Sequence, residues 1–295
     1  MKRLVLISFL FLLLMSPVLA ATVGAQDRPN PTETAEQAIV ELELRDGSLL
    51  RGTILSESAE NIAFRTLGGS LIDIPSSDVV RRRTIEGRMT DDGFLEFDPN
   101  STRLLFGPTA RSLRSGNRYI AAHELFLLSG ATGIGNSLTL WGGISIVPAA
   151  SKQLVFVAPK FTLVDRGNKA LAAGFVLGTV TGGSSGGGIM YASGTLGGPE
   201  QALTLGTGFL FGGGEVLTSP IVMIGAHKQL SSRVKLITEN YAMPTEGGGV
   251  VMSGALRLIG GRLTSDFGGI THTSALSGSG FPVFPWLSFS YHFSR

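Results

Sequence analysis

Residues 101–295 consist largely of apolar segments of about ten residues, separated by glycine-rich or polar turns. The last segment places four apolar residues on one parity: Leu287, Phe289, Tyr291 and Phe293. Successive side chains of a β-strand point to opposite faces, so each such segment has one apolar face. No stretch of this half shows a helical period of useful length. The pattern therefore predicts an antiparallel sheet whose apolar face must be covered.

Either a second protein layer or lipid would cover that face. Charged residues make up 16% of the chain, below the typical value of about 25%. A soluble sandwich would place more Lys and Glu on its outer positions and edges. In hydrocarbon each unpaired backbone group costs several kcal/mol, so a spanning sheet must close on itself. We therefore predict an all-β protein with a membrane-type antiparallel β-barrel of about 10–12 strands over residues 101–295.

Segments of this length match the 9–11 residues that a tilted strand needs to cross a bilayer. The expected strands lie near 101–107, 118–128, 137–147, 153–164, 169–180, 187–196, 202–212, 218–228, 232–241, 249–259, 262–271 and 284–293. The last of these would close the barrel, with its apolar parity toward lipid.

The first residues indicate export. Residues 1–20 combine Lys2 and Arg3, an apolar run and a small-residue site ending at Ala20, the layout of a secretory signal peptide. Residues 21–37 are polar and predict a disordered lead-in. The chain has no cysteine, so neither a disulfide nor a thiol nucleophile is available.

Residues 38–86 predict a separate small domain of five short strands, with a turn at Asp46 and Gly47. This segment resembles the Sm-like small barrels in its alternating strands, its Asp46-Gly47 turn, Gly52 and a strand beginning at Ile54. That resemblance implies an SH3-like barrel, and RNA binding in the family. An exported domain without an aromatic stacking platform beside Arg81–Arg83 argues against nucleic acid. We expect a periplasmic module that binds a protein partner, followed by a linker over 87–100.

The final strand also resembles the C-terminal signature of bacterial outer-membrane β-barrels, which alternates and ends on an aromatic residue such as Phe293. That resemblance implies recognition by the barrel-assembly machinery, although Ser294 and Arg295 follow it here. Residues 98–293 are similar to an uncharacterised exported β-barrel family of Gram-negative bacteria. The stretches that carry this likeness are 98–113, 118–148 and 234–241. The implied location is the outer membrane.

Charged residues on the inward parity are the candidate site. Eight are expected to face the lumen: Glu124, Lys160, Arg233, Lys235, Glu239, Arg257, Arg262 and Asp266. They would either form a paired network that plugs the barrel or line a narrow polar path, because about twelve strands lie between filled and open barrels. The four histidines lack ligand spacing, and no cofactor or metal motif occurs.

Three functions remain open at this point. The first is an outer-membrane barrel of structural or small-solute channel type with a periplasmic interaction module. The second is a soluble exported β-protein that binds a partner or an apolar ligand. The third is a membrane-embedded hydrolase using Ser185, but its Gly/Ser loop lacks the strand, helix and histidine of a nucleophile elbow. The sequence therefore predicts no enzyme.

Overall fold

The computed structural model describes residues 39–90, 93–183, 186–243, 248–277 and 282–293. The predicted signal peptide and lead-in, and Ser185, lie outside these residues. The described chain forms two compact units, residues 39–97 and residues 98–293. Within the described ranges, no helix has the length and apolar character to span a membrane.

The first unit is a five-stranded antiparallel sheet. Its strands are β1 (Ile39–Leu44), β2 (Leu49–Glu57), β3 (Asn61–Thr66), β4 (Leu71–Pro75) and β5 (Val79–Ile85). Val40, Leu42, Ile62, Phe64 and Ile74 form its core, as their alternation predicts. The sheet order is β4-β3-β2-β1-β5.

One prediction for this unit stays a prediction and another needs correction. In the described residues β4 and β5 each pair on one side only, so the sheet is not closed and the structure does not show the SH3-like small barrel. Alternation identifies strands, whereas closure depends on pairing between strands far apart in sequence. Residues 87–100, predicted to be a linker, contain the hairpin β6 (Gly87–Thr90) and β7 (Gly93–Glu96). Buried Glu96 joins this hairpin to the sheet through ion pairs with Arg51 and Arg83.

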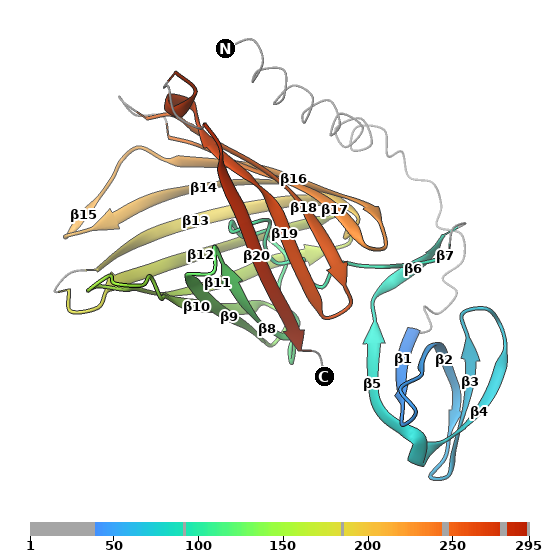
Figure 1. The fold of residues 1–295 in the computed structure, drawn as a ribbon. Coiled ribbons are helices and arrows are strands. Elements are labelled where there is room, and N and C mark those ends of the chain that lie inside the picture. Colours follow the sequence, from blue (N-terminus) through green and yellow to red (C-terminus); the bar gives the residue numbers. More distant parts are fainter. Residues whose placement is uncertain (1–38, 91–92, 184–185, 244–247, 278–281, 294–295) are drawn as a thin grey trace. The chain divides into compact units, whose positions relative to one another are not determined.

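The second unit is a closed antiparallel barrel of twelve strands (Figure 1). They are β8 (Arg118–His123), β9 (Leu127–Ile134), β10 (Leu138–Ser145), β11 (Leu154–Arg166), β12 (Lys169–Val180), β13 (Gly186–Gly197), β14 (Gln201–Gly212), β16 (Ile221–Ser231), β17 (Val234–Ala242), β18 (Val250–Gly260), β19 (Leu263–His272) and β20 (Phe284–Phe293). The short β15 (Glu215–Val216) pairs only with β14. The first barrel strand, β8, pairs with the last, β20, and this pairing closes the ring.

Side chains divide between the two faces of the barrel as the alternation predicts. On β20, Trp286, Ser288, Ser290 and His292 are buried inside, whereas Tyr291 and Phe293 are exposed outside. Apolar side chains cover the outer face of the other strands in the same way, for example Leu171, Ile224 and Leu256. The outer face therefore suits hydrocarbon better than water.

The strand count was correct, but two of the predicted strands were wrong. Residues 101–107 are not part of the barrel wall. Residues 118–128 contain the whole of β8, a turn at Glu124–Phe126 and the start of β9. Their apolar run continues through the turn with Leu125 and Phe126, so periodicity gave no sign that the chain reverses there.

Phe64 is fully buried in the first unit. We expect Phe64→Ala to cost about 3–5 kcal/mol and to unfold residues 39–97 without unfolding the barrel. Limited proteolysis followed by heat-modifiable gel migration measures the two effects separately. Leu71→Ala is the control because Leu71 is largely exposed. Loss of the folded barrel in Phe64→Ala would contradict the independence of the two units.

Candidate functional site

Residues 98–113, which precede the first barrel strand, lie inside the barrel (Figure 1). We call them the interior segment. Its buried residues are Asp98, Asn100, Thr102, Arg103, Leu104, Leu105, Gly107, Thr109, Ala110 and Leu113. Contacts join the segment to residues on β10, β11, β13, β17, β18 and β20. The lumen is therefore filled by a piece of chain as well as by side chains of the wall.

Two oppositely charged wall residues bind the backbone of this segment. Glu239 of β17 accepts hydrogen bonds from the N–H groups of Leu105, Phe106 and Gly107 with its Oε2 atom, at 2.8, 3.0 and 3.0 Å. Its Oε1 atom accepts a hydrogen bond from the Tyr241 hydroxyl. A carboxylate on three backbone donors makes charge-assisted bonds, which are stronger than neutral ones.

Lys160 of β11 binds backbone carbonyl groups of the same segment. Its Nζ atom donates to the carbonyl oxygens of Thr102, Thr109 and Arg111 at 2.9, 2.9 and 2.7 Å. All three donors of the ammonium group are therefore used on the interior segment. Together, Glu239 and Lys160 bind six backbone groups of the interior segment; the Thr102 carbonyl also accepts a hydrogen bond from the Thr109 N–H.

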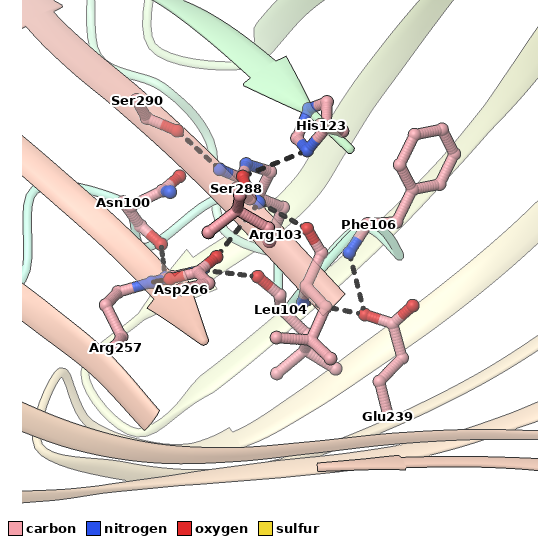
Figure 2. A network of polar contacts seen from close by, with 12 residues as sticks. Asn100, Arg103, Leu104, Phe106, His123, Glu239, Arg257, Asp266, Ser288 and Ser290 are labelled. Atoms are coloured by element: carbon pink, nitrogen blue, oxygen red, sulfur yellow. Dashed lines mark hydrogen bonds and ion pairs between the residues drawn. The ribbon is translucent and has the colours of Figure 1, made fainter. Parts of the chain in front are cut away.

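A second cluster anchors the beginning of the segment, and Figure 2 shows its Arg257 and Asp266 beside Asn100 of the segment. Arg257 of β18 donates to both carboxylate oxygens of Asp266, at 2.6 and 2.9 Å, and to Asp98 at 2.9 Å. Lys235 also pairs with Asp98, at 3.0 Å. All four side chains are 2% exposed or less. Because a buried ion is costly unless paired, each of these groups depends on the others.

Arg103 links the segment to the closing strand. It donates to Ser290 of β20 at 2.6 Å and to the carbonyl of Leu105, and it lies 3.7 Å from Asp266. Its guanidinium also lies 5.9 Å from the centre of the Tyr119 ring on β8. The segment therefore contacts both strands at which the barrel closes.

Glycines in the wall and in the segment permit the close approach. A Cβ atom at Gly225 of β16 would lie 2.1 Å from a Cδ atom of Leu104, and one at Gly133 of β9 would lie 2.2 Å from the Leu113 carbonyl. A Cβ at Gly107 would lie 2.5 Å from the Tyr241 hydroxyl. The interior thus has a shape complementary to the segment.

The structure brings together five of the eight charged residues expected in the lumen. Lys160, Lys235, Glu239, Arg257 and Asp266 are buried inside the barrel. The other three lie in turns at the ends of strands: Arg233 is exposed, and Glu124 and Arg262 are half-buried. Strand parity does not hold beyond the last paired residue, which explains why these three differ.

Sequence reasoning missed Asp98 and Arg103. Both carry charge in a stretch for which the sequence predicts a linker and a first strand. Five basic or acidic residues on the inward parity of a lipid-facing sheet did signal that something polar fills the lumen. They did not indicate that the partner would be the chain's own backbone.

The described residues contain no candidate metal site. They contain no group of three or more His, Asp or Glu side chains placed to hold a metal ion. His123 contacts only hydroxyl groups in its hydrogen bonds, those of Ser129 and Ser288.

No known family profile matches the sequence, and no curated protein matches it significantly. Among solved structures, the chain is similar to the KdgM porin in complex with disordered oligogalacturonate, with 8% identity and a TM-score of 0.46 over 60% of this chain and 98% of that one. It is also similar to a variant of OccD1 (OprD), with 11% identity and a TM-score of 0.35 over 88% and 96% of the two chains. A third is OmpT lacking loop L8, an outer membrane protein of Vibrio cholerae, with 12% identity and a TM-score of 0.33 over 87% and 97%. Likeness this distant assigns no residue roles, and the barrel is defined by the strand pairings of this chain itself.

Arg257 is the centre of the buried ion cluster. We expect Arg257→Ala to lower the free energy of unfolding by about 3–5 kcal/mol, because it leaves Asp98 and Asp266 without their shared cation. Urea unfolding in detergent micelles, followed by tryptophan emission, measures the change. Arg233→Ala is the control, since that side chain is exposed, and should change stability by no more than about 0.5 kcal/mol. Equal effects of the two changes would contradict the assignment.

Asp98 gives the cluster a defined response to pH. Burial raises the pKa of Asp98, but Lys235 and Arg257 lower it more, so the net pKa is well below its ordinary range. A carboxyl group with a depressed pKa adds stability above its unfolded value of about 3.9 and loses it only as the pH falls toward the folded value. We therefore expect the stability difference between wild type and Asp98→Asn to stay constant from pH 7 to 5 and to shrink below about pH 4. A decrease of this stability difference between pH 7 and 5 would contradict a lowered pKa of Asp98.

Proposed function

We propose that this protein is an outer-membrane β-barrel channel for small solutes that is closed at rest by its interior segment. The observation that carries the proposal is the way the segment is held. Hydrogen bonds from the wall bind its backbone and ion pairs bind its Asp98 side chain, while every barrel strand keeps its own pairing. The segment is therefore able to leave the lumen without breaking the hydrogen bonds between the barrel strands.

The outer face supports the membrane location. Apolar side chains point outward from strand after strand, and a closed sheet leaves no row of unpaired backbone groups for lipid to meet. The alternative of a soluble exported β-protein would leave this apolar surface in water. Resistance to carbonate extraction and heat-modifiable gel migration distinguish the two; a soluble, heat-insensitive protein would refute the membrane location.

A structural barrel without transport is the other candidate. In a purely structural role the interior would be filled most simply by side chains of the wall. Here Gly133 and Gly225 leave space that Leu113 and Leu104 occupy. The wall is thus shaped to receive a removable part, which favours a gate.

The first unit is proposed to be an SH3-like periplasmic interaction module. Its strand order and core support a small-barrel relationship, and the open edges offer sites for a protein partner. Phe97 is joined directly to Asp98, the first anchored residue of the interior segment. A partner that pulls on this module would exert a force on Asp98 through the chain, and this force would act on the ion pairs of Asp98.

Conductance in planar lipid bilayers tests the gate. We expect wild type to be nearly silent and Glu239→Ala to conduct, because three buried N–H groups lose their acceptor. Glu239→Gln keeps an acceptor oxygen and should conduct less than Glu239→Ala, and Arg233→Ala should resemble wild type. A chain lacking residues 39–113 keeps all twelve barrel strands and should conduct continuously. If that deletion is also silent, the channel role is wrong and a structural role remains.

A further inference from the structure

The wall of the barrel is incomplete beside the closing strand. The pairing of β20 with β8 ends at Ser288 and His123, although β20 itself extends to Phe284 (Figure 1). In the part of the chain that the structure describes, residues 284–286 pair with β19 alone. One edge of β20 is therefore open beside the β8–β9 turn.

The sequence is adapted to this open edge. Leu287 directs its backbone toward β8: its carbonyl accepts from the Glu124 N–H at 2.8 Å, and its N–H donates to the Glu124 carboxylate at 2.6 Å. Backbone groups alternate between the two sides of an antiparallel strand, so residue 285 faces the same open edge. That residue is Pro285, which has no N–H to leave unpaired.

The β8–β9 turn that supplies Glu124 is strained. Glu124 and Leu125 have φ values of 50° and 62°, a backbone conformation that non-glycine residues rarely adopt. Hairpin turns with two such residues normally use Asn and Gly. Such strain persists where the surroundings enforce it and often marks a functional position. Here it positions the Glu124 carboxylate on the edge and leaves Leu125 and Phe126 at 54% and 47% exposure.

A chain of ring contacts leads inward from Trp286 at the open edge through His123 and Phe106 to Trp141. Trp286 is buried and packs near His123, with ring centres 6.0 Å apart. Phe106, at the turn of the interior segment, contacts His123 and Trp141 with ring centres 5.6 and 4.8 Å apart. Trp141 in turn contacts Phe156. The inner surface at this point is therefore mainly aromatic, with His123 hydrogen-bonded to the Ser129 and Ser288 hydroxyls, unlike the charged interior around Arg257 and Lys160.

We propose that this edge is a lateral opening through which an acyl chain of the surrounding membrane reaches Trp286, Trp141 and Phe106. A second protein strand is a poor occupant, because Pro285 offers no donor and the Leu287 N–H is already bound. The exposed Leu125 and Phe126 form an apolar rim, and the aromatic rings form an apolar lining. Only an apolar ligand matches both surfaces. The inference rests on the proposed membrane location but not on channel activity.

The two tryptophans of the chain, Trp141 and Trp286, both belong to this lining, so intrinsic emission reports on it. The protein is reconstituted into phosphatidylcholine vesicles with brominated acyl chains, which quench tryptophan at short range. Trp141→Phe isolates the signal of Trp286. Two matched chains carry a single tryptophan elsewhere in the Trp141→Phe, Trp286→Phe background. Phe267→Trp places it outside on β19, and Tyr191→Trp places it inside on β13, opposite β20 in the ring.

We expect Trp286 to lose its emission nearly as completely as the outer tryptophan at position 267, and much more than the inner one at position 191. Quenching of Trp286 no greater than that at position 191 would overturn the opening. Protection of Trp286 together with a cross-linked dimer would instead assign the edge to a second copy. Absence of quenching at position 267 would refute the membrane location itself, so the two failures are distinguishable. Heat-modifiable migration of every variant verifies that it folds.

Discussion

Backbone hydrogen bonding without water is the constraint on which the rest of this structure depends. A sheet with an apolar outer face is stable in hydrocarbon only if its N–H and C=O groups find partners within the protein. Twelve strands achieve this by a ring of pairings that ends where β20 meets β8. At residues 284–286, which do not pair with β8, no N–H group faces the open edge, because Pro285 lacks a donor, and the N–H of the next residue on that edge, Leu287, donates to Glu124.

The interior segment shows the same constraint inside the barrel. An irregular stretch of chain has backbone groups that no strand satisfies, so the wall supplies charged side chains for them. Glu239 binds consecutive N–H groups and Lys160 binds carbonyl groups. Buried charges are an expensive way to gain stability, but they fix one geometry sharply. An interior held by such contacts has one defined geometry, which is the closed state of the proposed gate.

The proposed gate and the proposed lateral opening share one residue. Phe106 has its N–H bound by Glu239, and its ring packs against His123 and Trp141. Movement of the interior segment would therefore change the apolar lining as well as the polar lumen. Conversely, an acyl chain that contacts Phe106 would act on the residue next to the Glu239-bound turn. The two features give this barrel a physical link between its membrane side and its interior.

Alternation along the sequence determined ten of the twelve barrel strands, their inward and outward faces and the closing role of residues 284–293, because side-chain direction follows directly from position in a strand. It also identified Lys160, Lys235, Glu239, Arg257 and Asp266 as inward charges. It did not identify their partners, since Asp98 and Arg103 lie in a segment without strand periodicity. Only the tertiary structure decided that residues 98–113 fill the barrel, that β8 ends at His123, and that the first unit stays an open sheet. Each of these depends on contacts between residues distant in sequence, about which a local pattern contains no information.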